Sequence, residues 1–226
     1  MARLSRGKNF EQMKSRVLHV VAKMFLSQGY HKTTLRDVAT AADVAYSSLI
    51  NIFGSKEGIL AELVAYVLEG QFAATAQLLE GKTEDKILFY AAETTLQLYI
   101  AESHEHMREM YAVSYSLPET SRIIYDTITH KLQDIFCEHL PTLETKDFYC
   151  LELASGGIMR SFMTVPCDMF FTMDMKVRAF LQSTFRVYLV PEEKIEEAVA
   201  FVSRFDFWTI AASVTDNMLA YLKSKT

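Results

Sequence analysis

Residues that cross-link a chain or break its helices are scarce in this 226-residue sequence. It has three cysteines, four prolines and eight glycines, and it shows no β-hairpin signal such as Asn-Gly. Long stretches of helical period accompany this scarcity, so we predict an all-α fold. Cys137, Cys150 and Cys167 are odd in number and far apart. We expect reduced thiols, mostly buried, rather than a disulfide framework, and a thiol redox sensor remains the alternative.

Long apolar runs are also missing. No window reaches the eighteen or more apolar residues that a membrane span needs, and the start MARLSRGKNFEQMKSR has no apolar signal-peptide core. We therefore expect a cytoplasmic protein with no membrane partner.

Patterns of catalysis and of metal binding are absent. The sequence has no nucleophile elbow, HExxH, phosphate-binding glycine loop or CxxC. His104 and His106 are two residues apart, so on a helix they face different directions and cannot hold one metal ion together. We expect no enzyme, no cofactor and no metal site.

Charge divides the chain into two parts. Residues 1–60 hold nine Lys or Arg against four Asp or Glu, whereas 61–226 hold 14 against 24. The net charge of −5 therefore hides a cationic head on an acidic body, and it does not argue against nucleic-acid binding.

The head has the pattern of three short helices followed by a longer one. Val17, Val21 and Phe25 form an apolar stripe that Gly29 ends, and Thr34 caps a second helix expected at about 35–41. A third helix at about 45–52 turns its apolar side inward. Its other side presents small hydroxyls, an amide and an aromatic ring, which can read base edges in a major groove. These outward residues are Tyr46, Ser47, Ser48 and Asn51.

The runs AKMFLSQGYHKTTLRDVA and FGSKEGIL, within about residues 12–62, resemble the amino-terminal domain of the TetR family of transcriptional repressors. Three positions depart from the family pattern. Asp43 replaces the turn glycine, Ala45 replaces a capping serine, and Ile50 replaces a tyrosine that in relatives touches the DNA backbone. The lost cap costs about 1 kcal/mol.

Further DNA contacts are expected at helix starts, where free amides favour phosphate. Lys56 follows the probable cap Ser55, and Thr34 and Arg36 stand at the start of the second helix. A basic arm of Arg3, Arg6 and Lys8, placed before the first helix, either reaches the DNA or is a solubilising tail.

We divide the chain into a helix-turn-helix domain, 1–55, and a helical effector-binding and dimerisation domain, 56–226, joined by a long helix at 56–79. Further helices are expected from Thr83 to Ser103, between Pro118 and Pro141, from Leu143 to Thr164, and near the carboxyl end. The body holds 22 of the 27 aromatic residues. This surplus suggests a cavity for an apolar or aromatic effector, as the resemblance also implies.

Two groups of side chains could line such a cavity. Methionines and phenylalanines after Leu153 are soft and adaptable, although ordinary core or interface packing explains them equally well. Polar anchors could come from the middle of the body. The predicted ligand-binding residues are Tyr111, Tyr115, Arg122, Tyr125, Met159, Phe162 and Met163.

One reader helix of this kind needs a two-fold partner to read a useful site, so we expect a homodimer. The contact helix is expected at about 146–164, paired with 177–189 or 206–222. The resemblance implies a repressor that binds a palindromic operator and leaves it when an effector swings the long helix like a pendulum. The alternative is a small-molecule binding or protein-interaction module that has lost sequence-specific DNA reading.

Overall fold

The computed structural model describes residues 2–224, with side chains from Phe10 onward. These residues form eleven helices and no strand, which confirms the all-α prediction. In chain order they are α1 (Ala2–Gln28), α2 (Leu35–Ala41), α3 (Tyr46–Phe53), α4 (Lys56–Leu79), α5 (Lys86–Glu102), α6 (Glu105–Ser114), α7 (Pro118–Phe136), α8 (Thr145–Thr164), α9 (Met173–Val187), α10 (Glu192–Val202) and α11 (Phe207–Ser224).

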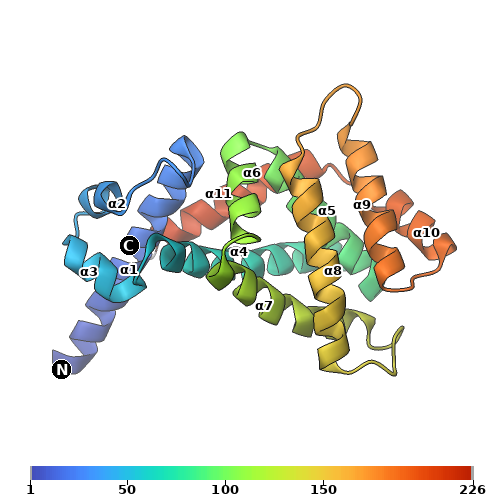
Figure 1. Cartoon of the computed structure of the whole chain (residues 1–226), viewed down its shortest axis with the longest axis horizontal. Coiled ribbons are helices and arrows are strands. Elements are labelled where there is room, and N and C mark those ends of the chain that lie inside the picture. Colours follow the sequence, from blue (N-terminus) through green and yellow to red (C-terminus); the bar gives the residue numbers. More distant parts are fainter. Residues whose placement is uncertain (1, 225–226) are drawn as a thin grey trace.

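Figure 1 shows α1 to α3 at one end of the molecule and α9 and α10 at the other, with α4 extending between them. The head is α1 to α3, and the body is α5 to α11. The body is not separate from the head, because α1 packs against α6 and α11 as well as against α2 and α4.

Local signals set the helix ends of the head. Gly29 takes a positive φ of 84° directly after α1, and Asp43 takes a φ of 51° in the turn before α3. Glycine has no β-carbon to oppose such angles, and aspartate tolerates them better than most residues. The Thr34 hydroxyl accepts a hydrogen bond from the Asp37 amide at 3.2 Å, as a cap should. The second helix therefore has the predicted bounds.

The chain start differs from the prediction. Backbone that was expected to form an arm is helical from Ala2 onward, so Arg3, Arg6 and Lys8 belong to α1. Their side chains lie outside the described part of the chain.

Helix α4 corrects a second expectation. By length and composition alone Lys56–Leu79 is apolar enough to cross a membrane, although the sequence was expected to contain no such segment. In this fold 44% of its most apolar window is buried, and the helix packs against α5 and α7. Part of its apolar surface therefore faces the protein interior.

Two helix ends in the body also differ from the prediction. Asp85 rather than Thr83 caps α5, because its carboxylate accepts the amides of Ile87 and Leu88 at 2.8 and 3.2 Å. His104 caps α6, an additional helix, by accepting the His106 amide at 3.1 Å.

The cysteine prediction is wrong on burial. Cys137 and Cys150 are exposed, and Cys167 is half-buried. All three are free thiols, as predicted.

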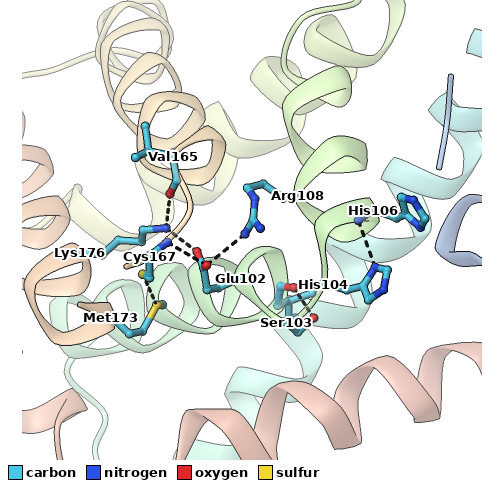
Figure 2. Close-up of polar contacts among 10 residues, drawn as sticks. Glu102, Ser103, His104, His106, Arg108, Val165, Cys167, Met173 and Lys176 are labelled. Carbon is cyan, nitrogen blue, oxygen red and sulfur yellow. Dashed lines mark hydrogen bonds and ion pairs between the residues drawn. The ribbon is translucent and has the colours of Figure 1, made fainter. Parts of the chain in front are cut away.

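A buried ion pair joins α5, α6, α9 and the segment after α8. Figure 2 shows Lys176 and Arg108 approaching Glu102 from two sides. The Lys176 amine lies 2.5 Å from both Glu102 Oε2 and the Val165 carbonyl, and Arg108 Nη1 lies 3.1 Å from Glu102 Oε1. Burial raises the pKa of Glu102, but these bonds and the Cys167 amide outweigh it and hold that pKa below its ordinary value. The cluster fixes where α9 begins.

Candidate DNA interface and ligand cavity

The outward face of α3 is available for contact. Tyr46, Ser47 and Asn51 are exposed and Ser48 is half-buried, while Leu49 and Phe53 are buried against the head core. We call Tyr46, Ser47, Ser48 and Asn51 the reader face. Its hydroxyls, amide and ring can exchange hydrogen bonds with base edges and phosphates.

The start of α3 is weakly capped, as the sequence predicted. Ala45 occupies the cap position and has no side-chain hydrogen bond to the helix amides. Free amides at a helix start attract anions, so this end of α3 can still bind phosphate.

Four predicted contact residues line one open surface groove at the starts of α2, α3 and α4. Thr34, Arg36, Tyr46 and Lys56 lie there together with His31. Arg36 is exposed, whereas the Thr34 hydroxyl also donates to the Asp37 carboxylate at 2.6 Å. The groove therefore brings one free cation, Arg36, beside the aromatic end of the reader face.

Lys56 has a structural role that the sequence did not reveal. Its amine donates to the carbonyls of Tyr30 and Thr33 at 3.0 and 3.1 Å and lies 4.1 Å from the centre of the Tyr30 ring. Burial lowers the pKa of Lys56, and Glu109 partly opposes this. Lys56 thus holds the turn between α1 and α2, and only its remaining hydrogen can reach a phosphate.

A cavity of about 110 Å³ lies where the head meets the body. Its walls come from α1, α4, α5, α6, α7 and α11, and they are mostly apolar. Tyr111 and Tyr115 line it, as predicted for ligand contacts, and both are buried. Ala22 and Leu26 of α1 belong to the same wall, so the head itself touches the cavity.

The other predicted ligand residues do not line this cavity. Arg122 is exposed on α7, and Tyr125 is half-buried outside the cavity. Phe162 packs against the Phe180 ring at 5.8 Å, and Met163 is buried in the core, because α8 turns these residues toward α9. Core packing, one of the two readings of the methionine-rich segment, describes them better.

Met159 lines a second, smaller cavity of about 30 Å³. Glu93 of α5 and Glu152 of α8 lie in its wall, and each is at least 97% buried. Burial raises the pKa of Glu93 to about 7 and that of Glu152 to about 8. No Lys, Arg or His forms an ion pair with either carboxyl group within residues 10–224.

Sequence reasoning missed the buried polar groups other than tyrosine in the cavity walls. Gln97 lines both cavities, as the predicted Tyr115 does, and Gln71 lines the larger one. A glutamine or glutamate inside an apolar helical stretch is the only signal that marks them. That signal cannot say which face of the helix will be buried.

Helix α6 forms the main polar contacts between head and body. The Glu109 carboxylate accepts the His31 amide at 2.9 Å, and His106 Nδ1 lies 2.9 Å from the Leu26 carbonyl. Met107, Met110 and Tyr111 of the same helix line the cavity. A change in the cavity can therefore reach the head through α6.

Residues 17–63 match the family model described as bacterial regulatory proteins, tetR family. This stretch, which spans most of the head and the start of α4, is similar to the tetR family of bacterial regulatory proteins. Similar chains include the HTH-type transcriptional repressor KstR2 of Rhodococcus jostii, 29% identical over 91 residues, which are 40% of this chain and 45% of KstR2. The uncharacterized HTH-type transcriptional regulator YezE of Bacillus subtilis is 34% identical over 74 residues, or 33% of this chain and 38% of YezE. The chain thus matches less than half the length of these curated relatives.

The likeness to solved structures extends beyond the head. The crystal structure of RolR in complex with the ligand resorcinol superimposes with a TM-score of 0.68 at 14% identity and covers 85% of this chain and 95% of RolR. The crystal structure of RolR without ligand superimposes with a TM-score of 0.53 at 15% identity and covers 78% of this chain and 96% of RolR. At such identities the likeness concerns the fold alone.

Within the described residues, no three His, Cys, Asp or Glu side chains come together as a metal ion requires. Figure 2 shows the His104 ring turned toward the His106 amide, which is the helix cap described above.

Proposed function

We propose that this chain is a ligand-responsive transcriptional regulator of the TetR family in the cytoplasm, which binds a palindromic operator as a homodimer and releases it when a small molecule binds. The single observation that carries this proposal is the cavity between head and body. One wall belongs to α1 of the DNA-reading head, so occupancy of the cavity and position of the head are coupled.

DNA reading is assigned to α3. Asn51 is exposed on the reader face, and an asparagine side chain is suited to a bidentate contact with adenine. Tyr46, Ser47 and Ser48 contact neighbouring bases or phosphates, and Thr34, Arg36 and Lys56 contact the backbone from the adjoining groove.

Release is assigned to α6 and α4 together. A ligand that fills the cavity presses on Met107 and Tyr111 of α6 and on Leu63 of α4. Because α6 bonds to the backbone around Gly29 and α4 follows directly on α3, both helices move the head. A change in the spacing of two reader helices breaks the register with half-sites one or more turns of about 34 Å apart.

The dimer contact is assigned to α8 and α9. Tyr149, Leu153, Gly157 and Ser161 form an exposed stripe along α8, and Met175 is exposed at the start of α9. The alternative partner, α11, also exposes large aromatic side chains, Trp208 at 49% and Tyr221 at 45%, but much of its apolar face is taken up within the chain. Its Ala211 and Val214 are buried, and its Met218 and Leu219 line the cavity.

The effector is proposed to be small and largely apolar, of about the size of one aromatic ring. A cavity of about 110 Å³ is somewhat smaller than the ~150 Å³ cavity known to take up benzene. The structure of RolR holds resorcinol, a ligand of that size, in a related fold.

A module without sequence-specific DNA reading is the competing function, and the uncapped start of α3 gives it some support. Selection of sequences from a random duplex library at a stated salt concentration separates the two. An inverted repeat is expected, and it would establish a dimeric reader. Binding that enriches no sequence and disappears at moderate salt would overturn the proposal, since only nonspecific electrostatics behaves in that way.

A further inference from the structure

Two buried amide groups in the wall of the larger cavity have an oxygen without a partner. Gln71 and Gln97 are 0% and 3% exposed, and the Oε1 atom of each accepts no hydrogen bond. Their nitrogens are occupied. Gln71 Nε2 donates to the Tyr111 hydroxyl, and Gln97 Nε2 donates to Glu93 Oε1 at 2.6 Å. Each amide is therefore held with its oxygen free.

An unsatisfied buried acceptor costs about 1–3 kcal/mol, so two of them beside one cavity are expensive to keep. The hydroxyl groups of the wall do not relieve this cost. Ser114 donates to the Met110 carbonyl at 2.7 Å, Thr215 to the Ala211 carbonyl at 2.9 Å, and Tyr66 to the Met218 carbonyl at 3.3 Å. Tyr111 and Tyr115 also line the wall, but neither hydroxyl donates to the two amide oxygens.

Two buried carboxyl groups lie behind these amides. Glu93 holds Gln97 from the side of the smaller cavity, and Glu152 lies in the same wall. The titratable groups around the two carboxyls are tyrosines, namely Tyr90, Tyr111, Tyr115, Tyr125 and Tyr188. Tyrosine is neutral near pH 7, so nothing in this region balances a carboxylate.

Glu152 is itself held in a chain of hydrogen bonds. The Tyr188 hydroxyl donates to Ser155 Oγ at 2.7 Å, and Ser155 Oγ donates to Glu152 Oε2 at 2.8 Å. Bonds that point toward the carboxyl oxygen support its charged form once a cation is near.

We propose that the effector is a small amine in its protonated form, whose ammonium group donates to the free oxygens of Gln71 and Gln97 while Glu93 and Glu152 balance its charge. Its apolar body occupies the cavity between α4, α6 and α11. This inference rests on the ligand-binding role proposed above. It adds the chemical class of the ligand, which apolar walls alone do not define.

Benzylamine and benzyl alcohol make a matched pair of probes, since they differ in the group that the site should recognise. Binding of each to the full chain is measured by titration calorimetry at pH 7.5. We expect the amine to bind at least about tenfold more tightly, because hydrogen bonds to charged groups exceed neutral ones by that order. Equal binding, tighter binding of the alcohol, or binding of neither would overturn the inference.

Glu93→Gln tests the role of charge at nearly constant shape. We expect it to lower the affinity for benzylamine about tenfold and to leave that for benzyl alcohol within about twofold. Gln71→Leu removes a free acceptor without exposing a charge, and it should also lower the affinity for benzylamine. Glu138→Gln removes one carboxylate at the surface and serves as the matched control.

The outcomes for ligand and DNA are separable. If the library selection yields an inverted repeat but benzylamine is not preferred, the proposed ligand class is wrong and the proposed regulatory function stands. If benzylamine binds selectively but no DNA sequence is enriched, the regulatory function is wrong and the ligand site stands.

Discussion

If the head binds DNA as proposed, its side chains are expected to divide into those that read sequence and those that bind any DNA. Asn51 is free to contact a base, whereas Arg36 stands in the groove at the start of α2. Lys56 belongs to neither class alone, because its amine is bonded to the turn before α2. Replacing Lys56 therefore loosens the head in addition to removing a charge.

Asn51→Ala is expected to relax base preference at one position per half-site, with a loss of about 1–3 kcal/mol of discrimination. Arg36→Ala should instead weaken binding to all sequences and lower the salt slope by about one. Fluorescence anisotropy on the selected site and on single-base variants, at several salt concentrations, measures both. A uniform loss for Asn51→Ala would remove it from base reading.

Glu152 makes stability depend on pH. Burial raises its pKa from 4.5 to about 8, so the folded chain keeps a proton that the unfolded chain releases. Stability linked to this group is present below about pH 4.5 and is lost as the pH rises toward 8. Burial of Glu93 has the same effect, and the stability linked to Glu93 is lost as the pH rises toward 7.

Glu152→Gln removes this dependence. Relative to the parent chain, the variant should gain about 1–3 kcal/mol of stability between pH 5.5 and 8.5, as measured by urea unfolding at each pH. The exposed Glu138→Gln variant should show no such gain. A pH-independent difference for Glu152→Gln would mean that the carboxyl is ionised in the fold throughout.

At the scale of helices, the start of α9 depends on one buried charge. Lys176 is 1% exposed and bridges Glu102 and the Val165 carbonyl. Lys176→Met leaves Glu102 without its shortest partner and should cost about 3 kcal/mol in urea unfolding. Lys86→Met breaks a surface pair with Glu138 and should change stability little. Equal effects of the two substitutions would contradict this view of the buried pair.

The α8 stripe provides a test of the dimer. A β-carbon added at Gly157 meets no atom within 4 Å, so Gly157→Glu leaves the monomer fold unstrained. Placed in an interface, two buried like charges should shift the dimer to monomers in sedimentation equilibrium. Thr127→Glu on the exposed side of α7 is the matched control. A persistent Gly157→Glu dimer would exclude this surface from the contact.

Helix ends were predictable from sequence where the signal is local. Thr34 and Ser55 cap α2 and α4 with their own hydroxyls, and both helices begin where those residues predict. The cavity was much less predictable, because its wall joins residues from six helices. Gln71 and Met218 meet there although 147 positions separate them in the chain. Met163 was predicted from the sequence to line the pocket. It lies in the core instead, because α8 turns it toward α9.

At the scale of the whole molecule, α6 is the link between cavity and head. Glu109→Ala removes the carboxylate that holds the His31 amide. We expect the variant to bind the operator and the effector with nearly unchanged affinities, while the effector weakens its DNA binding several-fold less than in the parent chain. Titrating DNA binding with and without effector measures this coupling. Full retention of release would assign the transmission to α4 alone.

The wall that the cavity shares with the head also bears on how much effector is needed. Ala22 and Leu26 belong both to the head and to the cavity, so the two binding events are thermodynamically reciprocal. If effector lowers the affinity for the operator by some factor, operator lowers the affinity for effector by the same factor. If the chain acts as the proposed dimer, dimers on DNA bind effector last, and free dimers bind its first molecules. The effector concentration needed for release would then rise with the number of dimers in the cell.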